Sequence, residues 1–137
     1  MDITKLKIRD MRKMLDSGEI SASELTQGYI ERIKKYDGNV KSYITVTEEN
    51  ALESANAAQE KIKAGNAAPL CGIPMAIKDN ICTDGVKTTC ASKMLENFIP
   101  PYNATVMEKL DAQNIVMLGK VSMDEFAMGG LTLTSAF

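Results

Sequence analysis

Histidine is absent from the 137 residues of this chain. Its absence removes every catalytic triad that depends on an imidazole base and every metal site that uses an imidazole nitrogen. A catalytic base, if the protein has one, must therefore come from another residue type.

Strong charge of one sign and long apolar runs are also lacking. The formal net charge is -2 and the isoelectric point lies near 5.2, so the chain lacks the broad basic surface on which direct nucleic-acid binding depends. If RNA is involved, we expect a partner to hold it. No stretch approaches the roughly 20 apolar residues of a membrane span, and the charged start of the chain does not resemble a signal peptide. These features predict a cytoplasmic protein with no membrane partner.

Cysteine is scarce and poorly spaced for a metal or redox site. Cys71, Cys82 and Cys90 form no C-x-x-C pair, which a zinc knuckle or a dithiol motif would need. We therefore predict reduced and mostly buried thiols.

The composition that remains is that of an ordinary globular domain, with 45% hydrophobic and 25% charged residues. Apolar residues at helical spacing predict a helix over 4–16. A second helix begins at the S-x-x-E capping box of Ser21 and Glu24 and is expected to end at Asp37-Gly38. Residues 1–38 are therefore predicted to form a helical hairpin.

Residues 39–137 alternate between helical and strand-like patterns. We predict a strand over 41–46, a helix over 48–64, an apolar strand over 73–77, an irregular segment over 79–102, a helix over 104–113 with Val106, Met107 and Leu110 inward, and a strand over 115–118 closed by Gly119. Such alternation predicts an α/β fold whose sheet is at least partly parallel and is covered on both faces.

Lys78 is the residue in this pattern that is the clearest candidate for a catalytic role. With a two-residue period, Ile73 and Ile77 share one face of the predicted strand, and Ala76 and Lys78 share the other. A lysine that loses hydration at a strand end has a lowered pKa and can act as a base. The alternative is a solvated lysine paired with Asp79 or another acid, and pattern alone favours that alternative because most lysines are exposed.

A second polar stretch follows Gly119. Ser122 and Glu125 form another S-x-x-E box, which predicts a short helix that Gly129-Gly130 ends. The two glycines either cap that helix or let the backbone approach a ligand closely, and the cap is the commoner case. Asp124 and Glu125 are candidates for a metal pair, but the capping role of Glu125 is favoured and no metal is assigned.

Together these stretches resemble the amidase signature family. The words that carry the resemblance are G-I-P-M-A-I-K-D-N-I at 72–81, T-T-C-A-S-K-M-L-E-N-F at 88–98, A-T-V-M-E-K-L at 104–110 and M-D-E-F-A-M-G-G at 123–130. Within the family, the match is closest to the N-terminal portion of the A subunits of glutamyl-tRNA(Gln) amidotransferases. The resemblance implies that Lys78 is the lysine of a Ser/cis-Ser/Lys triad, which reverses the preference for a solvated lysine.

The resemblance also implies a fold and an activity. The fold is the N-terminal part of the family's mixed sheet with helices on both faces, preceded by the helical hairpin, so that 1–137 is a single incomplete domain divided at 38 and 39. The activity is hydrolysis of glutamine, whose ammonia converts Glu-tRNA(Gln) to Gln-tRNA(Gln) on partner subunits of a hetero-oligomer. ATP, magnesium and most tRNA contacts are expected on a partner, with no cofactor on this chain. Met128, Gly129 and Gly130 are implied to contact substrate.

Two departures from the family pattern limit that inference. The block that bears both serines and the oxyanion amides lies beyond Phe137, so this chain is predicted to be inactive alone. Leu131 and Leu133 replace a serine and a glutamate of the family word. Ser92, Ser122 and Ser135 do not stand in the nucleophile context and are not assigned.

Three alternatives stay open. The chain is a binding or scaffolding module whose opening hairpin docks a partner subunit, or it is another amidase-signature hydrolase that acts on a small amide without tRNA. A Schiff-base lyase also uses a lysine at a strand end, although the surrounding words give it little support.

Overall fold

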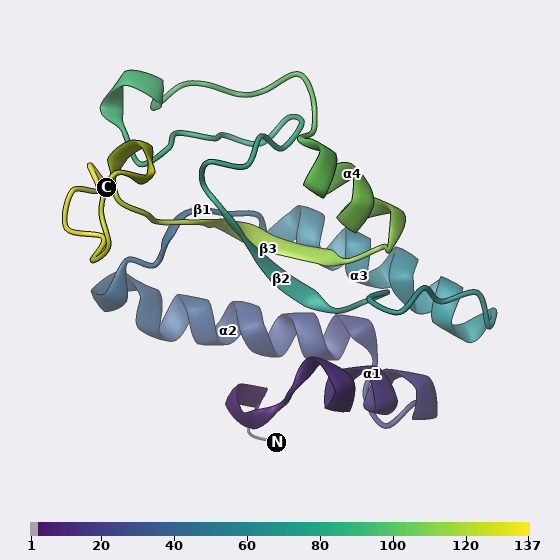
Figure 1. The fold of residues 1–137 in the computed structure, drawn as a ribbon. Coiled ribbons are helices and arrows are strands. Elements are labelled where there is room, and N and C mark those ends of the chain that lie inside the picture. The colour runs from purple at the N-terminus through teal and green to yellow at the C-terminus, as the bar shows by residue number, and fades with distance from the viewer. Residues whose placement is uncertain (1–2) are drawn as a thin grey trace.

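The computed structural model describes residues 3–137, and it has the α/β class that the sequence predicts. The elements are one-turn helices η1 (Ile3–Lys5), η2 (Lys93–Leu95) and η3 (Glu125–Ala127), helices α1 (Ile8–Ser17), α2 (Ala22–Val40), α3 (Glu48–Lys63) and α4 (Thr105–Ala112), and strands β1 (Tyr43–Val46), β2 (Pro74–Lys78) and β3 (Val116–Val121). Figure 1 shows their arrangement around one small sheet.

The sheet is mixed, with strand order β1-β3-β2. β1 runs antiparallel to β3, and β2 runs parallel to β3 with Lys78 opposite Val121. The predicted partly parallel sheet is therefore confirmed. Because β2 and β3 are parallel, the segments that follow them emerge at the same end of the sheet. That end is where ligands bind in open α/β sheets.

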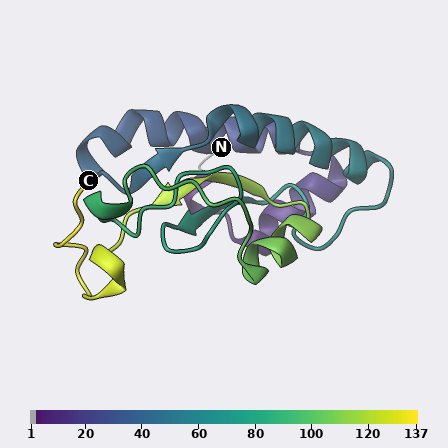
Figure 2. The ribbon, with the colours of Figure 1, turned by 90° about the horizontal axis from the view of Figure 1, so that it is seen from above.

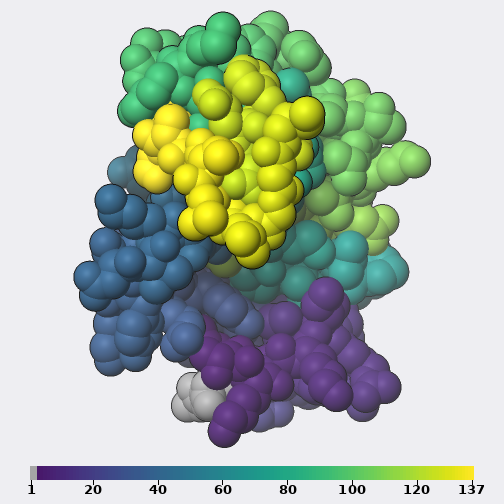
Figure 3. Space-filling view, turned by 60° about the vertical axis from the view of Figure 1, so that its left-hand side comes forward, coloured from purple at the N-terminus to yellow at the C-terminus, as the bar shows by residue number. Residues whose placement is uncertain are grey.

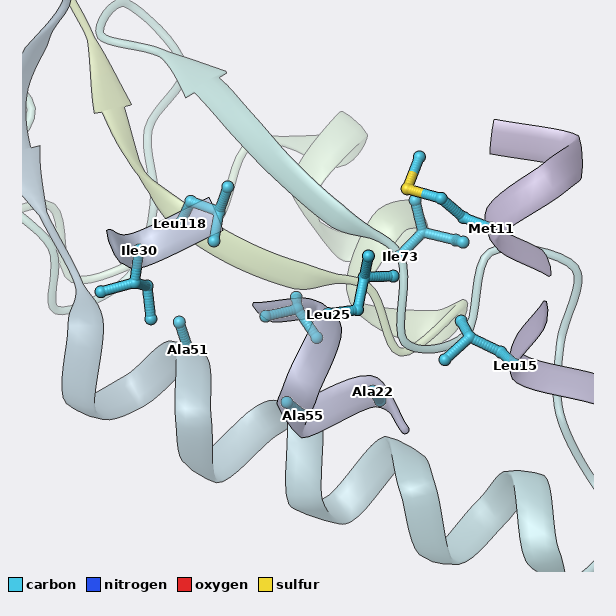
Figure 4. Packing of buried hydrophobic residues seen from close by; sticks show 10 residues of the cluster. Met11, Leu15, Ala22, Leu25, Ile30, Ala51, Ala55, Ile73 and Leu118 are labelled. Atoms are coloured by element: carbon cyan, nitrogen blue, oxygen red, sulfur yellow. The ribbon is translucent and has the colours of Figure 1, made fainter. Parts of the chain in front are cut away.

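Helices α2 and α3 lie together along one side of the sheet, while α4 and the segment between β2 and α4 lie towards the other (Figure 2). The side chains between the helices and the sheet are apolar and buried (Figure 4): Met11, Leu15, Ala22, Leu25, Ile30, Ala51, Ala55, Ile73, Val116 and Leu118. Burial of each large aliphatic side chain stabilises the fold by roughly 1.5 to 3 kcal/mol. This apolar layer therefore supports β2 and β3 on the side of the sheet that faces the helices.

The helical hairpin forms as predicted, with different ends. At the start of α2, Ser21 Oγ accepts from the amide of Glu24 at 3.1 Å, and the Glu24 carboxylate accepts from the amide of Ser21 at 2.9 Å. The first helix begins at Ile8 rather than at residue 4. The second runs to Val40 rather than ending at Asp37-Gly38. Asp37 does not stop the helix because its carboxylate instead accepts from two amides beyond the helix end, those of Ser42 and Tyr43.

Two predictions for the last helix and strand are wrong. Val106 is exposed on α4, whereas Met107 is buried as expected and Leu110 is half-buried. Gly119 does not end the strand, because β3 continues to Val121. With φ of 150°, Gly119 lies opposite Val46 where β1 pairs with β3, and a Cβ there would be 2.2 Å from the carbonyl oxygen of Thr45.

Candidate active site

Lys78 is the last residue of β2, and its side chain is exposed. The predicted period holds, because Ile73 and Ile77 are buried while Ala76 and Lys78 face outward. The expectation that Lys78 is held away from water is wrong for residues 3–137 taken by themselves, since its side chain is exposed there. Its assignment as the catalytic lysine stays a prediction.

Asp79 follows Lys78 directly and is completely buried. Its amide donates to the carbonyl of Val121 at 3.1 Å, and its carbonyl accepts from the amide of Cys90 at 3.0 Å. Its carboxylate accepts from the amide of Thr89 at 2.9 Å and from the Thr89 hydroxyl. Four bonds thus fix the backbone one residue beyond Lys78. The solvated alternative paired Lys78 with Asp79 or another acid, but the ion pair of Asp79 is with Lys120.

Lys120 lies in β3 opposite Ile77 and is also completely buried. Its ammonium donates to the carbonyl of Ile81 at 2.8 Å and to the hydroxyl of Thr88 at 2.6 Å, and it lies 3.6 Å from Asp79 Oδ1. Burial lowers the pKa of Lys120, and the Asp79 carboxylate opposes that shift. Sequence reasoning missed this residue. The available signal was a charged residue inside an otherwise apolar strand.

A second buried carboxylate, Asp124, organises the chain after β3. Its two oxygens accept from the amides of Leu131, Thr132 and Thr134 and from the Thr134 hydroxyl, at 2.9 to 3.2 Å. Hydrogen bonds from Thr132 and Thr134 hold the pKa of Asp124 below its ordinary value. Because these donors already occupy the carboxylate, Asp124 is not free to hold a metal.

The predicted second capping box does not form. Ser122 Oγ donates to Ser135 Oγ at 2.9 Å, and the Glu125 carboxylate accepts from Ser92 Oγ at 2.6 Å. Only the single turn η3 follows, and Phe126 and Ala127 within it have φ of 51° and 62°. The sequence pattern was misleading because both side chains have partners far along the chain.

Gly129 and Gly130 have different roles, and neither is the helix cap, which falls at Met128. A Cβ on Gly129 would lie 2.4 Å from the carboxyl carbon of Asp124, so Gly129 permits the loop to close over that side chain. A Cβ on Gly130 would meet nothing within 4 Å. Met128, Gly129 and Gly130 are exposed, and their contact with substrate stays a prediction.

The segments after β2 and β3 join each other at this end of the sheet. The amide of Phe126 donates to the carbonyl of Cys90 at 3.0 Å, and the amide of Ala136 donates to that of Ala91 at 3.0 Å. In Figure 3 the C-terminal segment, in yellow, packs beside the green segment that precedes α4. Lys78 and Met128–Gly130 therefore lie at the same end of two adjacent parallel strands.

The other predicted features have simple outcomes. The three cysteines are free, with Cys71 buried and Cys82 and Cys90 half-buried. Within residues 3–137, no group of three or more cysteine, aspartate or glutamate side chains has the arrangement of a metal site. None of the helices in that range combines the length and apolarity that a membrane crossing requires.

The profile of the family described as Amidase matches residues 24–137. The chain belongs to the amidase family. Across all 137 residues it is 59% identical to the A subunit of the glutamyl-tRNA(Gln) amidotransferase of Ruminiclostridium cellulolyticum, and it spans 28% of that protein. It is similar in structure to the A subunit of the Thermotoga maritima amidotransferase, with a TM-score of 0.76, 38% identity, 100% of this chain covered and 27% of the other.

Amidases outside the tRNA-dependent group have the same fold. The peptide amidase of Stenotrophomonas maltophilia matches with a TM-score of 0.85 and 28% identity over 91% of this chain and 26% of its own. The recognised family resemblance is thus confirmed. The amidase fold is shared among enzymes with different names, and this chain spans between a quarter and a third of each of these relatives.

Proposed function

We propose that these residues are the N-terminal part of a glutamine-hydrolysing amidotransferase subunit in which Lys78 is the catalytic lysine. The observation that carries the proposal is the 59% identity, over the whole chain, to the A subunit of a glutamyl-tRNA(Gln) amidotransferase. The local structure supports it, because the exposed Lys78 ends β2 at the end of the sheet where open α/β proteins bind ligands. Asp79, the next residue, is buried and fixed by four hydrogen bonds.

Lys78 acts in this mechanism as a base on a relay of two serines. It takes a proton from the bridging serine, which in turn deprotonates the nucleophilic serine as that hydroxyl attacks the glutamine carboxamide. The carbon–nitrogen bond then breaks as the proton held by Lys78 returns through the bridging serine to the leaving nitrogen. Ammonia leaves, and water hydrolyses the acyl-enzyme to glutamate and the free serine. Backbone amides stabilise the oxyanion in both steps.

The two serines of the relay come from outside these residues. Ser92 and Ser122 are engaged with Glu125 and Ser135 at 2.6 and 2.9 Å, away from a nucleophile's role. The exposure of Lys78 agrees with a site completed by chain that lies beyond the 28% spanned here. The ammonia then passes to partner subunits, which use ATP and magnesium to activate Glu-tRNA(Gln), and the net charge of -2 agrees with tRNA bound mainly there.

The test is ammonia release from glutamine by the subunit that carries these residues, assembled with its partners. Lys78→Ala is expected to abolish release while the subunit still folds and assembles, because the Lys78 side chain is not part of the apolar core. Lys87→Ala, a change at another exposed lysine, is the matched control and is expected to retain full release. Full activity of the Lys78→Ala variant would refute the proposal.

A second candidate is an amidase that acts on a small amide or a peptide amide without tRNA. The TM-score of 0.85 to the peptide amidase favours it on structure alone. A direct comparison of glutamine with C-terminally amidated peptides as substrates separates the two. Faster turnover of the peptides, with no dependence on partner subunits, would favour this second candidate.

A further inference from the structure

We propose that Lys120 is a positioning residue that fixes the direction in which Lys78 leaves the sheet. This inference rests on the proposed role of Lys78 as the catalytic lysine. It concerns a buried cation that does not itself touch substrate and acts through the segment directly after β2.

The geometry of Lys120 joins three parts of the chain. It stands in β3 opposite Ile77, the residue before Lys78. From there its ammonium reaches past the end of β2 to the carbonyl of Ile81 at 2.8 Å and to the Thr88 hydroxyl at 2.6 Å. The Lys120 side chain therefore connects β3 to the first and last residues of the loop over 81–88.

The Asp79 carboxylate completes the arrangement. Asp79 Oδ1 is buried and has no hydrogen-bond partner, and Lys120 Nζ, at 3.6 Å, is the cation beside it. Its other oxygen holds Thr89, adjacent to the Thr88 that Lys120 binds. Lys120 and Asp79 thus hold the same short segment, residues 88 and 89, from the two strands.

A lysine is a costly residue for this position if packing is its only role. Removing an ammonium from water is unfavourable, and burial lowers the pKa of Lys120 accordingly. An aliphatic residue would fill the space in β3 but would leave the Ile81 carbonyl and Asp79 Oδ1 without a cation. The lysine is therefore explained by the turn that it holds, and Lys78 precedes that turn.

The experiment uses Lys120→Met, alone and combined with Asp79→Asn, in the assembled subunit, with Lys78→Ala beside them. In the single variant, we expect kcat for ammonia release to fall roughly 100-fold while KM for glutamine stays within about 3-fold, because a displaced catalytic group costs rate more than binding. In the double variant, the unpaired carboxylate is gone. We expect the melting temperature to recover and kcat to stay low.

The outcomes separate positioning from simple charge balance. Recovery of kcat together with the melting temperature in the double variant overturns the proposal, because Lys120 would then serve only to neutralise Asp79. A folded Lys120→Met variant with kcat within about 3-fold of the parent also overturns it.

A third variant covers the case in which Lys120→Met does not fold. Thr88→Val removes one partner of the ammonium and keeps the side-chain shape, and we expect kcat to fall about 10-fold. An unchanged kcat in that variant overturns the proposal. Activity that survives Lys78→Ala contradicts the proposed function itself and so remains distinguishable from failure at Lys120.

Discussion

In the helical layer, apolar side chains from α1, α2 and α3 bury one side of the sheet, whereas the segments after β2 and β3 are held by two carboxylates and a lysine. Leu25 and Ile30 are completely buried among aliphatic neighbours (Figure 4). Asp79 and Lys120 are equally buried, but their neighbours are hydroxyls, amides and carbonyls.

This difference matters because the two kinds of packing constrain the chain differently. Apolar packing tolerates exchange between residues of similar volume, so it stabilises a layer without fixing each atom. Hydrogen bonds to buried charges are directional, and a lost partner leaves an unpaired group at high cost. The polar region is therefore suited to hold a reacting group such as Lys78 in one orientation, and the apolar layer is suited to support it from behind.

The largest effect should come from breaking the buried ion pair. Asp79→Ala leaves the Lys120 ammonium buried without its anion and should cost about 3 to 5 kcal/mol of unfolding free energy. Urea unfolding followed by circular dichroism measures it. Asp84→Ala, an exposed aspartate in the same segment, is the control and should change little. A loss below about 1 kcal/mol for Asp79→Ala would show that the polar region contributes less than we claim.

A somewhat smaller effect is expected in the apolar layer. Leu25→Ala removes a completely buried side chain and should cost about 3 kcal/mol, through lost burial and the cavity it leaves. Met94→Ala, at a side chain that is 85% exposed, is the matched control. Equal losses in the two variants, measured by the same unfolding curves, would contradict the layer described here.

The loop after β3 offers a pair of adjacent glycines for a finer test. In Gly129→Ala the new methyl group collides with the Asp124 carboxyl group, so we expect a loss of about 1 to 3 kcal/mol and faster amide exchange at Leu131 and Thr132. Gly130→Ala meets open space and should leave both unchanged. A larger loss of unfolding free energy in Gly130→Ala than in Gly129→Ala would contradict this description of the loop.

The smallest of the expected effects is a loss of stability in acid, caused by protonation of Asp124. Its folded pKa is lowered, so the unfolded chain takes up the proton first; the stabilisation is present above about pH 4 and is lost as the pH falls through the lowered pKa. Asp124→Asn should therefore reduce the loss of stability below about pH 4. Part of the loss should remain, because hydrogen bonds from Ser21 also lower the pKa of Glu24. Urea midpoints between roughly pH 2 and 6 measure the slope, and identical slopes would exclude Asp124 as a source.

The apolar half of the fold was predictable from sequence, because periodicity reports which face of an element is buried. The helical hairpin and the helix after β1 follow from that signal. The Ser21 cap follows from the S-x-x-E spacing, and a partly parallel sheet follows from the alternation of helices and strands. The ends of elements were less predictable. Gly119 matches the pattern of a strand end, but it lies within β3 and permits the close approach of β1, its antiparallel neighbour.

The polar half could be predicted only in part. The outward position of Lys78 follows from alternation along β2, but its exposure does not, because that depends on what else covers the strand. The Lys120–Asp79 pair joins two residues far apart in the sequence, and no local pattern specifies such a contact. Ser122 and Glu125 show the same limit, since a local capping pattern lost to partners elsewhere in the chain.

The account depends most on where the Lys78 amine lies when the site is complete. A crystal structure of the assembled subunit with glutamine bound would measure the distance from Lys78 Nζ to the nearest serine hydroxyl beside the carboxamide. We predict a buried amine within hydrogen-bond reach of that hydroxyl, with the Lys120 contacts to Ile81 and Thr88 intact. A Lys78 amine that points into solvent, away from the bound glutamine, would contradict the account.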